Sequence, residues 1–145
     1  YTGTGTIALF VSKLAKKVVG VEAVADAIKD AEENANNNQI GNCHFEVGDM
    51  KNVFNDEFFA RHGKPDVVIT DPPRDGMHAD VVAQLLKIEA SKIVYVSCNP
   101  ATQARDLDAM KNHYDIVRIK PVDMFPHTLH IENVVQLKRT DLLNA

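Results

Sequence analysis

The sequence predicts an α/β fold with a mostly parallel sheet, because short apolar runs alternate along the chain with segments of helical periodicity. Strands of a parallel sheet are buried on both sides, and so we expect helices on both faces of this sheet. The last two apolar runs are joined only by residues 121–130, without a helical segment, which predicts that the final strands pair antiparallel. The length of 145 residues suits one domain with a substantial core.

Six segments are typical of strands, since they are apolar or alternating and end at acids or turn residues. They cover residues 17–22, 43–47, 65–70, 92–97, 115–120 and 131–138. The third ends just before Pro72 and Pro73, because neither proline has an N–H group for the ladder.

Five segments are predicted to be helices, and they cover residues 5–16, 24–37, 52–62, 79–89 and 100–111. The periodicity is clearest in the second, where apolar residues follow at helical intervals: Val24, Ala27, Ile28, Ala31 and Ala35. The fifth is expected to begin with Asn99 as its cap and Pro100 at its first position.

The chain opens on a glycine-rich turn, Tyr1-Thr-Gly-Thr-Gly-Thr, placed directly ahead of the first predicted helix. Turns of this kind normally follow a buried strand. We therefore expect that strand upstream of Tyr1, and we interpret residues 1–145 as one domain of a longer protein.

Composition and charge exclude several classes of protein. The net charge of -4 argues against a chain that grips a nucleic-acid backbone on its own. No apolar run approaches the roughly 18 residues of a membrane span, and we find no secretory leader. Two cysteines suit a reducing, cytoplasmic setting. No metal site is expected, since the spacing of the late histidines His113, His127 and His130 matches no metal pattern.

Chemically useful residues follow the predicted strands. Glu22, Asp49, Asp71 and Cys98 each stand at the carboxyl end of a separate strand, and the Gly3–Gly5 turn would follow the strand upstream. In open α/β sheets, ligands bind beyond the carboxyl ends of the strands. We therefore expect one edge of the sheet to gather three acids, a thiol and a glycine turn.

Three of these features suit an adenosine cofactor. The glycines let a ligand approach the backbone closely, because no Cβ intervenes. Glu22 lies 19 positions after Gly3, near the spacing at which an acid binds ribose hydroxyls. Asp49 could accept a hydrogen bond from an adenine amino group. The competing interpretations are an ordinary tight turn, a solvated acid at Glu22 and simple turn chemistry at Gly48–Asp49.

Two further motifs suit a reaction centre. In Asp71-Pro-Pro-Arg74 the prolines hold Asp71 in a fixed place, and Arg74 offers a planar, permanently charged donor. In Ser97-Cys-Asn-Pro100 the thiol lies between a buried strand and a helix N-terminus, which favours a thiolate. The competing interpretations are a proline-rich strand terminator and a buried apolar cysteine, and we expect the latter for Cys43.

Four motifs together carry a family resemblance: Tyr1-Thr-Gly-Thr-Gly-Thr, Asp71-Pro-Pro-Arg74, Ser97-Cys-Asn-Pro100, and Phe125-Pro-His-Thr with His130-Ile-Glu132-Asn. The set resembles the catalytic domain of the RNA uracil-5-methyltransferases, which use S-adenosylmethionine to make 5-methyluridine in tRNA or 23S rRNA. The resemblance covers essentially the whole chain. It implies a class I methyltransferase (Rossmann-like) sheet with an antiparallel last strand and its first strand upstream of this chain.

The resemblance also implies roles for individual residues. S-adenosylmethionine would be bound by Tyr1, Gly3, Gly5, Glu22, Asp49 and Asp71. Cys98 matches the family's nucleophile and Glu132 its base, while Asp71 would lie beside the reacting groups and Arg74 near the nucleotide. The RNA substrate would be held largely by regions outside residues 1–145.

Two other classes of protein stay open. A methyltransferase acting on an exocyclic amino group would use an acid-Pro-Pro-aromatic motif. Here Arg74 stands in place of the aromatic residue, and such chemistry has no use for Cys98. A non-catalytic, Rossmann-like nucleotide-binding domain would need only the Gly3–Gly5 turn and its neighbouring acid.

Overall fold

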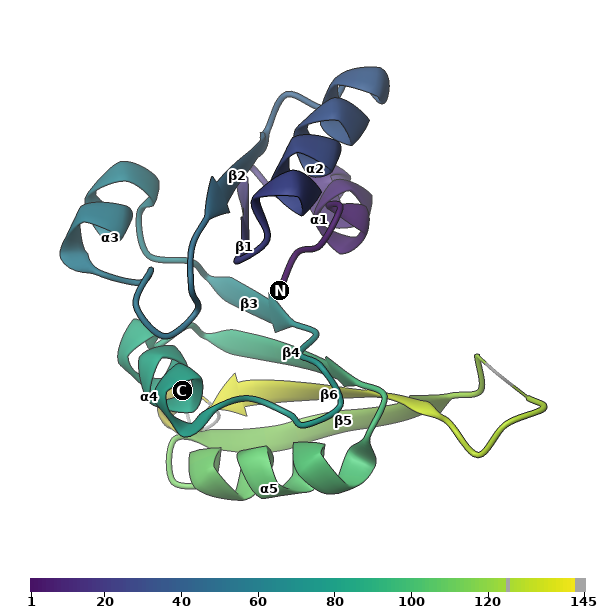
Figure 1. The fold of residues 1–145 in the computed structure, drawn as a ribbon. Helices are drawn as coiled ribbons and strands as arrows, with labels where there is room; N and C mark the ends of the chain where they lie inside the picture. Colours follow the sequence, from purple (N-terminus) through teal and green to yellow (C-terminus); the bar gives the residue numbers. More distant parts are fainter. Residues whose placement is uncertain (125, 143–145) are drawn as a thin grey trace. The chain divides into compact units, whose positions relative to one another are not determined.

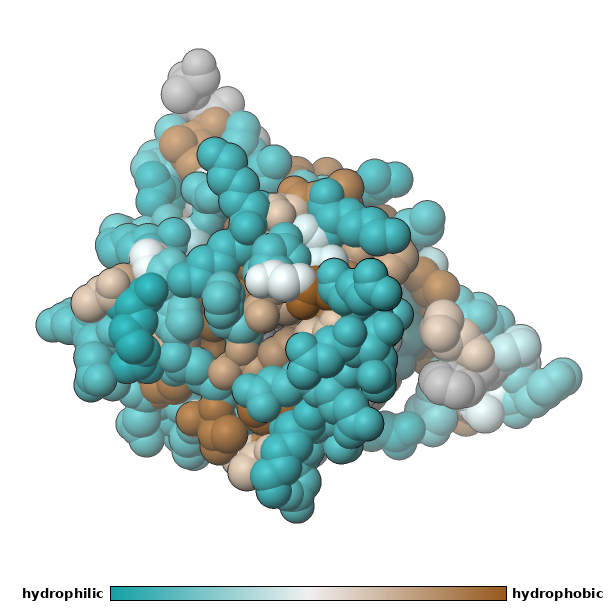
Figure 2. All heavy atoms as spheres, turned by 90° about the horizontal axis from the view of Figure 1, so that it is seen from above, coloured by the Kyte–Doolittle hydropathy of each residue, from teal (hydrophilic) through white to brown (hydrophobic). Residues whose placement is uncertain are grey.

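The computed structural model describes residues 1–124 and 126–142. The chain divides into two compact units, residues 1–62 (the N-terminal unit) and residues 63–145 (the C-terminal unit), whose elements are labelled in Figure 1. No helix in the described ranges is long and apolar enough to cross a membrane. Hydrophilic side chains predominate on the face shown in Figure 2, with hydrophobic ones in patches between them.

The N-terminal unit is built around two parallel strands, β1 (Val18–Glu22) and β2 (Cys43–Val47), which α2 (Ala25–Asn37) connects. A short helix, α1 (Thr6–Val11), precedes β1 and continues as a 3-10 turn. The buried side chains of α2 are those of its predicted apolar stripe, Ile28, Ala31 and Ala35.

Helix α3 (Asp56–His62) closes this unit and begins four residues later than the sequence predicted. The reason is the turn after β2, where the N–H groups of Asn52 and Val53 both donate to the carbonyl of Asp49, each at 2.9 Å. That turn occupies the residues that the sequence pattern assigned to the first turn of the helix.

The C-terminal unit contains a four-stranded sheet in the order β3-β4-β6-β5. β3 (Val67–Thr70) and β4 (Lys92–Ser97) pair parallel, with α4 (Ala79–Ile88) between them in the chain. Helix α5 (Pro100–Met110) leads to β5 (Tyr114–Val122), and β6 (Glu132–Arg139) follows before a final 3-10 turn. β6 pairs antiparallel with both β4 and β5, which confirms the predicted antiparallel last strand.

The core of this unit lies between one face of the sheet and the helices α4 and α5. The sheet contributes side chains that are at most 1% exposed: Ile93, Tyr95, Val135 and Leu137. The helices contribute Val81, Val82, Leu85, Ile88 and Met110, which are also buried. Successive side chains of a strand point to opposite faces of a sheet, and the apolar ones of these strands point to this face.

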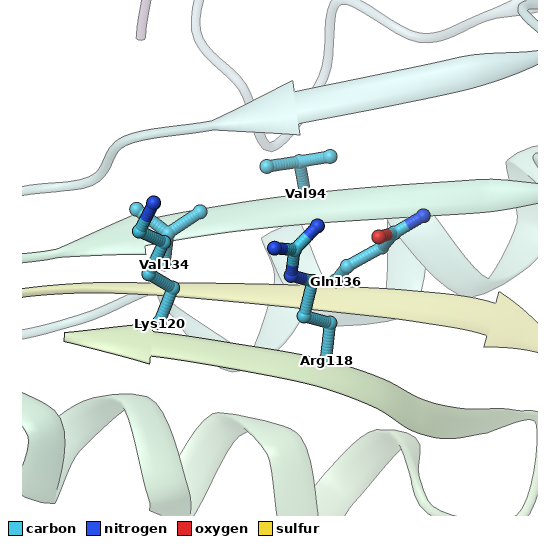
Figure 3. Close-up of a pocket in the computed structure, with 5 residues that line it drawn as sticks. All are labelled: Val94, Arg118, Lys120, Val134 and Gln136. Atoms are coloured by element: carbon cyan, nitrogen blue, oxygen red, sulfur yellow. The ribbon is translucent and has the colours of Figure 1, made fainter.

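The opposite face of the same sheet has an open hollow of about 230 Å³, lined by Val94, Arg118, Lys120, Val134 and Gln136. Figure 3 shows these side chains projecting away from α5. The prediction of helices on both faces concerned the whole sheet; within this unit, both described helices lie on one face, as Figure 1 shows. The physical reason is visible in β6, where buried Val135 and Leu137 alternate with the half-buried Val134 and Gln136.

Two other predictions need correction. The described strands form two sheets rather than one, and no described strand pairs with the second edge of β1 or of β3. β5 runs on to Val122 and includes Pro121, which the sequence analysis placed in a loop. A proline is tolerated there because β5 is an edge strand, paired only with β6.

Candidate active site

In the N-terminal unit, the glycine turn and Glu22 are directly linked. The backbone N–H of Gly3 donates to Oε2 of Glu22 at 3.0 Å. Gly3 adopts a left-handed φ of +52°, and a Cβ built on it would meet no atom within 4 Å, so its backbone borders open space. The turn is also fixed to β1, since the N–H of Thr2 donates to the carbonyl of Val21 at 3.0 Å.

The Glu22 carboxylate is held by backbone donors at the end of β1. Its Oε1 accepts from the N–H groups of Ala23 and Val24 at 2.8 and 3.2 Å. Partial burial alone raises the pKa of Glu22, but the N–H groups of Gly3, Val24 and Ala23 outweigh it, and the pKa lies below its ordinary value of 4.5. Glu22 is therefore a fixed anion at neutral pH.

Asp49 lies close to this group in the fold. The N–H of the preceding Gly48 donates to the carbonyl of Glu22 at 2.9 Å, which joins the carboxyl ends of β1 and β2. Oδ1 of Asp49 accepts from the N–H of Lys51 at 2.9 Å, as in an Asx turn. The structure thus brings Gly3, Glu22 and Asp49 to one end of the parallel pair.

Two other predicted cofactor residues belong to the same turn. Gly5 is the N-cap of α1, with a left-handed φ of +87° and little room for a Cβ, which would lie 3.1 Å from Cβ of Ala31. Tyr1 is half-buried at the start of the turn.

In the C-terminal unit, the strand ends collect the predicted reactive residues. Asp71 follows β3 and Cys98 follows β4, and these strands are parallel. Glu132 opens the antiparallel β6, so it begins at the end where β3 and β4 finish. The last registered pair of β4 and β6 is Ser97 with Asn133, and the next residues outward are Cys98 and Glu132. Residues opposite each other in an antiparallel pair have Cα atoms about 5 Å apart.

The half-buried Cys98 is held in a short, braced loop. The N–H of Asn99 donates to Oγ of Ser97 at 3.0 Å, and that hydroxyl donates to the carbonyl of Asn99 at 3.0 Å. Asn99 then caps α5 as predicted, because its Oδ1 accepts from the N–H of Ala101 at 3.1 Å and Pro100 is the first helical residue.

The same loop holds the Asp71-Pro-Pro-Arg74 segment. The carbonyl of Arg74 accepts from Nδ2 of Asn99 at 3.1 Å and from Oγ1 of Thr102 at 3.0 Å. The loops that contain Asp71 and Cys98 are therefore one hydrogen-bonded structure, and the side chain of Arg74 is exposed beside it.

Sequence reasoning missed the anchor of this structure, Asp106 of α5. Its side chain is 3% exposed, and its Oδ2 accepts from the N–H of Met77 and the hydroxyl of Tyr95, both at 2.7 Å. Arg105 adds a bond from Nη2 to the carbonyl of Asp75 at 2.8 Å. Gly76 lies against both side chains with a φ of +77°. Only the glycine after Asp75 could have pointed to a tight turn here.

Other predicted features lie apart from these two groups. Cys43 is half-buried rather than buried, and burial raises the pKa of its thiol. His127 and His130 are exposed. Phe125, part of the fourth motif, lies outside the described residues. Among the residues that the structure describes, no cluster of His, Cys, Asp or Glu could hold a metal ion.

Solved structures of methyltransferases share this fold. An rRNA methylase from Streptococcus thermophilus matches with a TM-score of 0.73 at 12% identity, over 96% of this chain and 82% of that one. TrmN from Thermus thermophilus matches with a TM-score of 0.71 at 19% identity, over 96% and 42%. The chain therefore has the class I methyltransferase fold that the sequence predicted.

A solved structure with higher sequence identity indicates the family within this fold class. The tRNA (uracil-54, C5)-methyltransferase of Pyrococcus abyssi, solved in complex with S-adenosyl-L-homocysteine, matches with a TM-score of 0.82 at 38% identity, over 94% of this chain and 32% of that one. The family described as tRNA (uracil-5-)-methyltransferase matches residues 1–140. The chain belongs to this family, as its motifs predicted.

Curated relatives agree with this assignment. Proteins of Bacteroides thetaiotaomicron and Porphyromonas gingivalis, both described as uncharacterized RNA methyltransferases, are 59% and 55% identical over 95% and 96% of this chain. The chain spans only 30% of the length of each.

Proposed function

We propose that the full-length protein methylates carbon 5 of a uridine in RNA, with Cys98 as the nucleophile and Glu132 as the base. The observation that carries the proposal is the register of β4 and β6. The last registered pair, Ser97 with Asn133, is followed on each strand by one of the two reactive side chains. A thiol and a carboxylate held next to each other at a strand end suit covalent catalysis with proton removal.

The N-terminal unit fits the adenosine part of S-adenosylmethionine. The ionised Glu22 can accept from a ribose hydroxyl, because a carboxylate has about four lone-pair sites and backbone N–H groups take three, which leaves one free. The open backbone at Gly3 admits the ligand, and the turn from Tyr1 to Gly5 would lie along it. Asp49 would accept from the adenine amino group, and Asp71 would lie beside the reacting groups.

The chemistry needs a thiolate because carbon 5 of uracil is a weak nucleophile. The sulfur of Cys98 adds to carbon 6, and the electrons of the carbon 5–carbon 6 double bond move onto carbon 5 and the carbonyl oxygen at carbon 4. Bound S-adenosylmethionine would supply an electrophilic methyl group to the enolate carbon; its sulfur–methyl bond would break, and S-adenosylhomocysteine would be the leaving group. Arg74 would stabilise the negative charge on the uracil oxygen, since its guanidinium is always protonated.

Release requires a base. Glu132 removes the proton from carbon 5, the double bond re-forms, and the carbon 6–sulfur bond breaks to return the Cys98 thiolate. Cys98 thus ends the cycle as the thiolate in which it began, and Glu132 ends it as a carboxylic acid, which gives the proton from carbon 5 to water. The RNA itself, either tRNA or 23S rRNA, would be held largely by parts of the full-length protein outside residues 1–145, because this chain has a net charge of -4.

The test uses variants of the full-length enzyme with labelled methyl donor and total RNA from a strain lacking the gene. Cys98→Ala should form no denaturation-resistant protein–RNA adduct, whereas the control Cys43→Ala should behave as wild type. Glu132→Gln should accumulate a methylated adduct while turnover falls by about 10²–10⁴-fold, as for a lost general base. An adduct in Cys98→Ala, or full turnover in Glu132→Gln, would contradict these roles. Methylation of an amino group without any adduct would favour the alternative class of methyltransferase.

A further inference from the structure

One buried side chain joins the elements that hold the two reactive residues. Gln103 of α5 is 1% exposed. Its Nε2 donates to the carbonyl of Tyr95 in β4 at 2.9 Å and to the carbonyl of Asn133 in β6 at 3.2 Å. Its Oε1 accepts from Nδ2 of Asn133 at 2.7 Å. A single amide therefore links a helix to two neighbouring strands.

This link lies close to the two proposed reactive residues. Asn133 belongs to the last registered pair of β4 and β6, and Glu132 is the next residue outward. On its other side β6 is still paired with β5 at this point, where Glu132 lies opposite Val122. On β4 the chain leaves the sheet after Ser97, so the backbone ladder alone does not fix Glu132 relative to Cys98.

We propose that the Gln103–Asn133 amide pair positions Glu132 relative to Cys98 and thereby sets the rate of product release. The inference rests on the proposed function of the two residues. While the sulfur of Cys98 is bonded to carbon 6, Glu132 must reach a proton on the adjacent carbon 5. The distance between Cys98 and Glu132 can therefore vary only slightly. Thiolate attack and methyl transfer need no contact with Glu132, so loss of the pair should slow proton removal selectively.

The experiment compares Gln103→Met with wild type in the full-length enzyme, again with labelled methyl donor and total RNA from the deletion strain. Methionine keeps the length of the side chain and removes both of its strong hydrogen-bonding groups. The ratio of methylated adduct to released methylated RNA should rise by about ten- to a hundredfold, as for a misplaced catalytic group. The kcat should fall and the KM for the methyl donor should fall with it, so that kcat/KM stays unchanged, because the slowed step follows methyl transfer.

The matched control is Tyr114→Phe. It removes a buried hydroxyl that donates to the carbonyl of Ala90 at 2.7 Å, near the other end of β4. This variant should lose stability but keep the wild-type ratio of adduct to product, because the hydrogen bond is remote from Cys98 and Glu132. If Gln103 had only a structural role, both variants would lose stability and keep the wild-type ratio of adduct to product.

If Gln103→Met does not fold, a second variant, Asn133→Leu, tests the positioning role of the amide pair. It removes one amide from the pair at a half-buried position and should raise the same ratio, though less. A wild-type ratio in every folded variant would overturn the inference. Glu132→Gln in the same assay distinguishes failure of the proposed function from failure of this inference. If Glu132→Gln accumulates no adduct, the proposed function fails. If Glu132→Gln accumulates adduct but the Gln103 and Asn133 variants do not, only this inference fails.

Discussion

At the scale of single residues, the most informative contact is that between Gly3 and Glu22. The sequence analysis connected them through a shared cofactor, using their spacing along the chain. The structure adds a direct hydrogen bond of 3.0 Å, which orients the carboxylate and keeps it ionised. A spacing rule could not supply this contact, because it depends on how the turn folds back onto β1.

We expect Glu22→Gln to weaken binding of S-adenosylhomocysteine by about tenfold or more, since hydrogen bonds to charged groups contribute about 1.5–3 kcal/mol. Glutamine still offers an oxygen to the N–H of Gly3, although its NH2 group then faces the N–H groups of Ala23 and Val24 and cannot accept from them. Isothermal titration calorimetry on the full-length protein measures the loss. The matched control is Glu33→Gln, on the exposed face of α2, which should bind as wild type.

The pH dependence follows from the lowered pKa of Glu22. The ionised form is the one that accepts from hydroxyls, and it is lost only as pH falls through the folded-state pKa, below 4.5. The contribution of Glu22 to affinity should therefore persist from pH 7 down to pH 5 and be lost only as the pH falls further. A loss of this contribution between pH 7 and 5 would contradict the assigned carboxylate.

At the scale of elements, the strands and helices follow the sequence pattern closely, and β2 and β4 have the predicted bounds. The departures have local causes: the Asp49 turn shortens α3, and the edge position of β5 admits Pro121. The polar anchors Asp106 and Gln103 could not be predicted. They lie within a helix, where a polar side chain is normally taken for solvent-exposed, and their partners belong to distant segments.

The loop after β3 is the element most sensitive to a small change. A Cβ at Gly76 would lie 2.6 Å from Nη2 of Arg105 and 2.7 Å from Oδ2 of Asp106, at a φ of +77°. Gly76→Ala should lower the free energy of unfolding by about 2–4 kcal/mol, through backbone strain and crowding together. Urea unfolding of the full-length protein measures this.

Gly63→Ala separates the two causes. Gly63 has nearly the same φ, +78°, but its Cβ would meet nothing within 4 Å. We expect this variant to lose only about 1 kcal/mol, the contribution of the left-handed backbone. Equal losses in the two variants would mean that crowding against the Asp106 anchor contributes nothing.

At the scale of the whole molecule, the fold class and the family could both be predicted, because ordered motifs at successive strand ends are more specific than any one of them. The arrangement of the sheets could not. The alternation in β6 indicates one apolar face, yet the general rule for parallel sheets favoured helices on both. The chain spans 30% of the length of its relatives from Bacteroides thetaiotaomicron and Porphyromonas gingivalis, and so the proposed reaction is one of the full-length protein.

The most direct test of the account is to trap and map the bond between protein and RNA. RNA containing 5-fluorouridine should be methylated once by the full-length enzyme and then stall, because Glu132 cannot remove fluorine as it removes a proton. Digestion and tandem mass spectrometry should find a methylated fluorouracil on the peptide that contains Cys98. A fluorouracil on any other residue, Cys43 included, or no covalent species at all, would contradict the proposed mechanism.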